Sequence, residues 1–352
     1  MNRIPVTILG ATGMVGQRFI SLLKDHPWFQ VTCLAASEGR AGQPYEDSVR
    51  WQLDDVIPEA VRRLPLQTLE EAVDATRLVF SALPSDLARQ WEPVYAKEGS
   101  IVCSNASAFR MEDDVPLLMP EVNPDHVQLL EIQRHRRGWR GAILTNPNCT
   151  SSGLTVALRA LQQACGVRRV FAVSLQALSG AGYPGVPSLD VTDNVIPYIA
   201  GEEEKVESEP LKMLGTLEDA RVRPAPILIS AHTNRVAVRD GHTVCAGVEL
   251  EQSLTPEQAM DIFRAYQAPA EARDLPSAPQ PPIRVREEPD RPQPRRDRME
   301  GNGMTTVVGR VRKDPLFHVK FVVLSHNTIR GAAGASIYNA ELLARQGWFK
   351  GD

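Results

Sequence analysis

The segment that most constrains the fold of this chain is GATGMVG, residues 10–16. It follows an apolar run at residues 4–9 and precedes residues 14–24, whose apolar positions have helical spacing. A glycine turn between a strand and a helix lets the free N–H groups of the helix start hold a pyrophosphate. The spacing is GxxGxxG and not GxGxxG, so a plain strand–helix turn is the competing interpretation. We expect cofactor contacts from Gly10, Thr12, Gly13, Met14, Val15 and Gly16.

Strand-like and helical segments alternate after this loop. Such alternation favours an α/β fold, here a Rossmann-like, doubly wound parallel sheet. The strands are expected at residues 29–36, 77–83, 99–103 and 142–145, with a helix between the second and third of these.

The pattern changes after Cys149, towards an α+β arrangement with a mixed sheet. We therefore predict a cofactor domain at residues 1–148, joined by a C-terminal helix within 327–352, and a catalytic and dimerisation domain at 149–326. Residues 268–298 contain eight prolines and could be a disordered linker, but spaced apolar residues favour an ordered excursion. The expected elements are a helix at 151–164, strands at 168–178 and 234–250, a helix at 255–266, a strand at 317–324 and a final helix at 331–346.

Composition excludes several classes of protein. The chain has 352 residues, 43% of them apolar, and a net charge of −4, which offers no broad basic field for nucleic acid. No apolar run approaches the roughly 20 residues of a membrane helix, and the N-terminus does not resemble a signal peptide. Five widely spaced cysteines without a CxxC pair suggest neither a disulfide framework nor a metal site. We expect a cytoplasmic enzyme with a small-molecule substrate.

The end of the second strand bears on the choice of cofactor. An acidic residue at this place usually binds the ribose hydroxyls of NAD. Here Ser37 and Arg40 suit the 2′-phosphate of NADP, whereas Glu38 would serve NAD. We expect NADP(H), with contacts from Ser37 and Arg40.

Cys149 lies in NPNCTSSG, residues 146–153, between a strand and a helix. The N–H groups and the dipole of a helix N-terminus lower a thiol pKa, and a thiolate attacks acyl carbons. The other four cysteines lie in apolar segments and are expected to be small core residues.

A proton-transfer partner is sought among the histidines. His242 follows the Asp240-Gly241 dipeptide, a strong hairpin signal. In such a hairpin Arg235 and His242 would share one face, with Cα atoms about 13 Å apart. His232 is the competing candidate.

Several motifs together resemble aspartate-β-semialdehyde dehydrogenases. These are GATGMVG, NPNCTSSG, QALSGAGYPGV (176–186), GEEEK (201–205) and RVAVRDGHT (235–243), and VIPYIAGEEEK and DRPQPRRD place the resemblance nearest the archaeal and fungal branch. The resemblance implies a homodimer or dimer of dimers. It also implies NADPH-dependent reductive dephosphorylation of aspartyl 4-phosphate to aspartate 4-semialdehyde, in the biosynthesis of lysine, threonine and methionine.

The resemblance also implies a role for individual side chains. Cys149 would be the nucleophile, His242 the acid/base, and Gln176 would orient the thioester. Arg235 would hold the substrate carboxylate and Glu202 its ammonium. Lys205, Arg110 and Asn148 would bind phosphate, and Ser179, Gly180, Gly182 and Asn327 would contact the nicotinamide.

Two observations qualify this resemblance. The branch commonly reads AASxRSAG after the second strand, whereas this chain has AASEGRAG, with Gly39 in place of the arginine, which leaves dual NAD/NADP use open. Malonyl-CoA reductase and N-acetylglutamyl-phosphate reductase share the cysteine chemistry, but Glu202 with Arg235 favours a free amino acid. A Cys–His hydrolase is disfavoured by the glycine loop, and a non-catalytic binding protein by Cys149.

Overall fold

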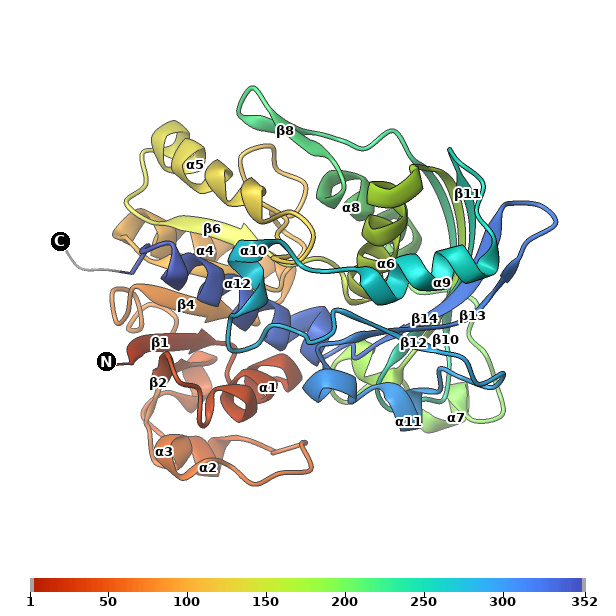
Figure 1. The fold of residues 1–352 in the computed structure, drawn as a ribbon. Helices are drawn as coiled ribbons and strands as arrows, with labels where there is room; N and C mark the ends of the chain where they lie inside the picture. The colour runs from red at the N-terminus through yellow and green to blue at the C-terminus, as the bar shows by residue number, and fades with distance from the viewer. Residues whose placement is uncertain (1–2, 350–352) are drawn as a thin grey trace.

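The computed structural model describes residues 3–349 and contains two large sheets side by side (Figure 1). All strand pairs of the first sheet are parallel, in the order β3-β2-β1-β4-β5-β6. This is the strand order of a dinucleotide-binding fold and confirms the predicted doubly wound sheet. Its strands are β1 (Ile4–Leu9), β2 (Phe29–Ala35), β3 (Leu66–Gln67), β4 (Leu78–Ser81), β5 (Ile101–Ser104) and β6 (Ala142–Thr145).

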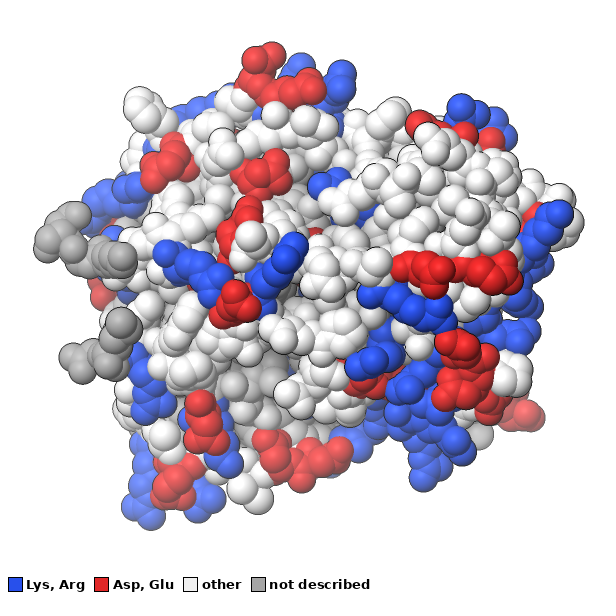
Figure 2. Space-filling model, in the orientation of Figure 1, with Lys and Arg blue, Asp and Glu red and all other residues white. Residues whose placement is uncertain are grey.

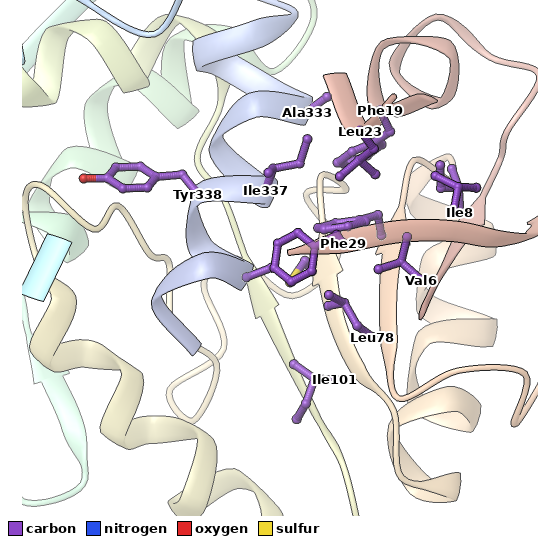
Figure 3. Close-up of a cluster of buried hydrophobic side chains, with 14 of the residues drawn as sticks. Val6, Ile8, Phe19, Leu23, Phe29, Leu78, Ile101, Ala333, Ile337 and Tyr338 are labelled. Atoms are coloured by element: carbon purple, nitrogen blue, oxygen red, sulfur yellow. The ribbon is translucent and has the colours of Figure 1, made fainter. Parts of the chain in front are cut away.

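Helices cover both faces of the first sheet because its strands are apolar on both sides. The helices α1 (Met14–Leu23) and α12 (Gly334–Arg345) lie on one face, and α4 (Ser85–Glu98) lies on the other. Figure 3 shows Ile337 of α12 beside Phe19 and Phe29, while Tyr338 points the other way. The prediction that the C-terminal helix packs on the first sheet is therefore confirmed.

The second sheet is mixed, as expected, in the order β10-β7-β11-β14-β13-β12. One face packs against α6 (Cys149–Cys165) and α9 (Pro256–Ala265) and contains a core that includes Phe263 and Phe321. Its strands are β7 (Val167–Gln176), β10 (Leu228–Arg235), β11 (His242–Leu250), β12 (Ile283–Arg286), β13 (Thr306–Lys313) and β14 (Val319–Ser325).

The predicted hairpin at Asp240-Gly241 is wrong. β10 runs parallel to β7 on one side, and β11 runs antiparallel to β7 on the other. The intervening residues cross the end of β7 instead of turning back on β10, and the N–H of Val236 donates to the carbonyl of Gln176 at 3.0 Å. Gly241, with φ of 101°, does adopt a turn conformation. However, β7 lies between β10 and β11, so these two strands do not pair with each other as they would in a hairpin.

The other face of the second sheet is open among the described residues. Side chains alternate along β7, so that Phe171 and Leu175 are exposed while their neighbours are buried. Cys245 lies on this open face, so the expectation that it is a core residue is wrong; Cys33, Cys103 and Cys165 are buried as expected. His232 also lies here against Phe171, with ring centroids 5.7 Å apart.

The proline-rich segment at 268–298 is ordered, as the sequence analysis favoured over a disordered linker. It contributes β12, which pairs with β13 at the sheet edge, and its Ala272 and Leu275 join the core beneath α12. The strands β12 and β13, the short strands β3, β8 and β9, and residues 228–233 of β10 were not predicted from the sequence. The remaining elements are α2 (Tyr45–Ser48), α3 (Glu59–Arg62), α5 (Leu129–Arg137), α7 (Ser188–Val191), α8 (Glu202–Met213), α10 (Ala270–Arg273), α11 (Pro294–Asp297), β8 (Thr216–Glu218) and β9 (Arg221–Arg223).

Acidic and basic side chains are interspersed over the face shown in Figure 2, with basic groups beside acidic ones over α11 at the lower right. Across residues 3–349, no helix is both long and apolar enough to cross a bilayer.

Candidate active site

Cys149 is the first residue of α6, whereas the helix was predicted to begin at residue 151 with Cys149 close to its N-terminus. Asn148 caps the helix: its side-chain oxygen accepts hydrogen bonds from the N–H groups of Thr150 and Ser151, at 2.9 and 3.3 Å. Behind the cysteine, Gly331 packs so closely that an added Cβ would lie 2.6 Å from Cys149 Cβ. The cap and this glycine together fix the place of the thiol.

His242 contacts the thiol, with its Nε2 atom 3.1 Å from Cys149 Sγ. Its Nδ1 atom accepts a hydrogen bond from the N–H of Ala177 at 3.0 Å. A neutral imidazole that accepts at Nδ1 carries its proton on Nε2, so the ring donates towards the sulfur. Burial and the nearby Arg235 lower the pKa of His242 to about 3, which favours this neutral form.

The thiol itself is neutral in this arrangement. Burial, followed by the charge of Glu202, raises the pKa of Cys149 to about 12, although Arg110 and Arg235 act in the opposite direction. The pKa is therefore raised and not lowered as expected at a helix N-terminus, because burial of the thiolate outweighs the nearby arginines and a backbone hydrogen bond.

Glu202, the first residue of α8, connects several predicted site residues. Its carboxylate accepts hydrogen bonds from Asn148 Nδ2 at 2.9 and 3.0 Å, from Gln176 Nε2 at 3.0 Å and from Lys205 Nζ at 2.9 Å. Burial would raise the pKa of Glu202, but these donors hold it below its usual value. The opposite end of the Gln176 amide, Oε1, is buried without a hydrogen-bond partner among the described residues.

Glu209 is a site residue that the sequence analysis missed. It lies on the same face of α8 as Glu202 and Lys205. Its spacing of two helical turns from Glu202 could have predicted from the sequence that it points to the same site. It is buried and accepts from Arg110 Nη1 at 2.9 Å and from the N–H of Asn148 at 2.5 Å. Arg110 Nε remains buried without a partner among the described residues.

Arg235 and His242 approach each other from opposite sides of β7. A Cβ added to Gly180 would lie 2.8 Å from Arg235 Nη1 and 3.1 Å from His242 Nε2, so both side chains reach one point. The side chains of Arg235 and His242 therefore converge on one point, whereas the predicted hairpin placed the two residues apart along one face. Nearby, Asn327 donates to Ser179 Oγ at 2.8 Å and accepts from the N–H of Gly241 at 2.8 Å.

A single cavity of about 510 Å³ between the two sheets collects most of the predicted residues. His232 does not line it, because it lies on the open face of the second sheet. The predicted residues that line the cavity are Val15, Arg110, Asn148, Cys149, Gln176, Ser179, Gly180, Glu202, Lys205, Arg235, His242 and Asn327.

Of the remaining predicted residues, Gly10, Thr12, Gly13, Met14 and Gly16 belong to the glycine loop itself, whereas Gly182, Ser37 and Arg40 lie outside it. Gly10 has φ of +72°, and a Cβ at Gly16 would lie 2.3 Å from the carbonyl oxygen of Gly10, so both positions require glycine. Met14 and Gly182 line an adjoining cavity of about 270 Å³. Ser37 lines a third cavity, of about 470 Å³, at the end of β2, whereas Arg40 is exposed and lines none of the three.

A doubly wound sheet with a glycine loop, next to a partly buried thiol–imidazole pair, defines a nucleotide-dependent enzyme that works through a cysteine. Family models agree with this class. The model described as semialdehyde dehydrogenase, NAD binding domain, matches residues 5–130, and the model described as semialdehyde dehydrogenase, dimerisation domain, matches residues 158–330.

Relatives specify the family further. The chain is 52% identical to an aspartate-semialdehyde dehydrogenase of Archaeoglobus fulgidus over 98% of this chain and 99% of the relative. It is 42% identical to that of Saccharomyces cerevisiae over 96% of each chain. The crystal structure of the Candida albicans enzyme with NADP has a TM-score of 0.90 at 38% identity, covering 99% of this chain and 100% of that one. The chain belongs to the aspartate-semialdehyde dehydrogenase family.

Proposed function

We propose that this protein catalyses the reversible, NADPH-dependent reductive dephosphorylation of L-aspartyl 4-phosphate to L-aspartate 4-semialdehyde, a step towards lysine, threonine and methionine. The observation that carries the proposal is the 3.1 Å contact between Cys149 Sγ and His242 Nε2 in a cavity with both acidic and basic side chains. The relatives named aspartate-semialdehyde dehydrogenase at 52% and 48% identity support the same reaction.

Cys149 would carry the acyl group. Its sulfur attacks the acyl carbon, the C–S bond forms, the C–O bond to phosphate breaks, and the thiol proton leaves with the phosphate. When bound, the reduced nicotinamide supplies a hydride to the thioester carbon. Collapse of the tetrahedral oxyanion breaks the C–S bond, releases the aldehyde and leaves a thiolate on Cys149. The N–H at His242 Nε2 stabilises this sulfur until a proton from solvent restores the thiol.

The charged side chains of the cavity fit the two ends of a phosphorylated amino acid. Arg235 would hold the α-carboxylate and Glu202 the ammonium, which would also neutralise the negative charge that raises the pKa of Cys149. Lys205, with a third of its side chain exposed, and the unpartnered Nε of Arg110 would bind the phosphate. Asn148 would act mainly through its cap on α6 and its bond to Glu202.

The glycine loop fits a dinucleotide. The N–H groups of Met14, Val15 and Gly16 belong to the first turn of α1 and have no acceptor within the helix. Gly13 at the N-cap has no side chain to fill the approach to these groups. Ser179 and Asn327, which are joined by a hydrogen bond, would lie on the nicotinamide side, together with Gly180 and Gly182.

We also propose a homodimer formed through the open face of the second sheet. Phe171, Leu175 and Leu228 are 39%, 37% and 69% exposed there, and the matching family model is described as a dimerisation domain.

Light scattering should give twice the mass of the chain for the native protein and the single mass for Phe171→Glu. Leu316→Glu, at a position 86% exposed between β13 and β14, is the matched control and should remain dimeric. A native monomer would reject this interface.

The described cysteines form no disulfide, which agrees with a reducing compartment, and we propose that the enzyme is cytoplasmic.

The reaction is tested in reverse by following the absorbance of the reduced nicotinamide. The mixture contains aspartate semialdehyde, phosphate and NADP, and a second mixture lacks phosphate. Phosphate-dependent formation of NADPH is expected. Absence of a signal from folded protein with a titratable Cys149 thiol would reject the reaction.

A further inference from the structure

Helix α8 carries a second pair of charged residues beyond Glu202 and Lys205. Glu209 and Lys212 continue the same spacing of three and four residues, so all four side chains leave one face of the helix. Glu202 and Lys205 line the cavity, whereas Glu209 and Lys212 lie behind its wall and are only 2% and 6% exposed. Charged side chains are seldom buried unless they are paired, so the partners of this second pair indicate what it does.

Glu209 uses both of its carboxylate oxygens at the phosphate end of the cavity. Its Oε1 atom accepts from Arg110 Nη1 at 2.9 Å, and its Oε2 atom accepts from the N–H of Asn148, directly before the nucleophile, at 2.5 Å. Arg110 Nη2 donates to the carbonyl of Asn105 at 2.7 Å. These bonds fix the plane of the guanidinium, whose Nε stays buried without a partner among the described residues.

Lys212 holds the chain that carries Arg110. Its Nζ atom donates to the carbonyls of Arg110, Glu112 and Val115 at 2.7, 2.7 and 2.8 Å. An ammonium group has three N–H donors, so all of them are used on this segment. Residues 110–115 form successive turns. Helix α8 therefore fixes both the backbone and the side chain of Arg110.

The charge of Glu209 makes a purely electrostatic role at this place unfavourable. A carboxylate 2.9 Å from Arg110 reduces the attraction of the guanidinium for an anion. The arrangement is instead favourable for geometry, because a guanidinium held by two acceptors loses little further freedom when it binds a phosphate.

We propose that Glu209 and Lys212 are positioning residues, which hold Arg110 in the orientation that binds the phosphate. Because the same helix carries Glu202, α8 also fixes the place of the phosphate relative to the amino-acid end of the substrate. The inference rests on the proposed function, since it concerns the phosphate end of the same site.

Glu209→Gln tests the first of these residues. One amide oxygen can replace only one carboxylate oxygen, and the amide N–H groups then face a donor of Arg110 or Asn148. In the reverse reaction, KM for phosphate should rise by about tenfold or more, while KM for aspartate semialdehyde changes by less than about threefold. Absorbance of NADPH is followed with each substrate varied separately, below the melting temperature of the variant.

Glu204→Gln is the matched control. It removes the same charge from the exposed side of α8 and should leave both KM values within about twofold of native.

A double variant separates positioning from a general loss of structure. If Glu209 acts through Arg110, Arg110→Ala with Glu209→Gln should raise KM for phosphate no further than Arg110→Ala alone, whereas independent effects would add. Lys212→Met provides a second test should Glu209→Gln not fold. It releases three carbonyls of the segment and should again raise KM for phosphate, by about five- to tenfold, with little change for the semialdehyde.

An unchanged KM for phosphate in folded Glu209→Gln or Lys212→Met would overturn the proposal. So would equal rises in both KM values, or additive effects in the double variant. If the native protein forms no NADPH in a phosphate-dependent way, the proposed function itself is rejected.

Discussion

The two sheets of this molecule place their functional residues in different ways. In the first sheet, each parallel strand is followed by its own loop, so Gly10 and Ser37 reach the cofactor edge directly from β1 and β2. In the second sheet, Arg235 and His242 come from β10 and β11, which are separated by β7. The residues expected to bind the cofactor are therefore placed by the loop directly after each strand. Arg235 and His242 are instead brought together by the segment that crosses the end of β7.

The cysteines show the same contrast. Cys103 in β5 and Cys149 at the start of α6 are both buried enough to raise the thiol pKa. Only Cys149 has an imidazole at 3.1 Å and a position on the cavity wall. Burial alone therefore does not separate a reactive cysteine from a structural one; the partner and the access to a ligand do.

Substitution of these two cysteines is expected to give the largest difference. Cys149→Ala should reduce kcat by at least about a thousandfold because the thioester cannot form, while the melting temperature stays near the native value. Cys103→Ala should instead retain kcat and lower the free energy of unfolding by about 1 to 2 kcal/mol through a small cavity. Steady-state kinetics and urea unfolding of both variants make the comparison. Substantial turnover by Cys149→Ala would end the thioester mechanism.

A buried ion pair behind the site gives the next largest effect, on stability. Arg330 and Glu121 are fully buried, with Nη2 and Oε1 2.5 Å apart, and Arg330 precedes the glycine that packs on Cys149. Arg330→Met leaves a buried carboxylate unpaired and should lower the free energy of unfolding by about 3 to 5 kcal/mol. Urea unfolding measures this loss.

The double variant Arg330→Met with Glu121→Gln is the control, since it removes both charges and should recover much of the stability. Removal of the exposed pair Arg140–Glu98 should change stability by less than about 1 kcal/mol. Equal losses for the buried and exposed pairs would show that burial of the first pair does not matter.

Arg235→Lys should have a smaller effect, mainly on binding. One N–H of Arg235 already donates to the carbonyl of Ala177 at 2.6 Å, which leaves the rest of the guanidinium for a substrate carboxylate. A lysine cannot hold both contacts, so KM for the amino-acid substrate should rise by about tenfold with kcat changed less. A fall in kcat at unchanged KM would instead place Arg235 in the chemical step.

The sequence was sufficient where structure is local. The glycine loop, the strands around it and the helix start near Cys149 each depend on neighbouring residues, and each was predicted. The Asp240-Gly241 turn was misassigned because pairing between distant strands, here β7 with both β10 and β11, leaves no local signal. The thiol pKa was misjudged for a related reason, since the burial of Cys149 depends on distant residues such as Gly331.

The last prediction concerns the pH dependence of thiol reactivity. Because the pKa of Cys149 is raised to about 12 by burial, the thiolate fraction should grow about tenfold for each pH unit over the working range. Alkylation of Cys149 by iodoacetamide should therefore accelerate steadily with pH up to about pH 9, without a plateau. Cys149→Ala serves as the blank for the exposed Cys245. A plateau near neutral pH would show that the helix N-terminus and Arg235 outweigh burial, and that the resting enzyme already holds a thiolate.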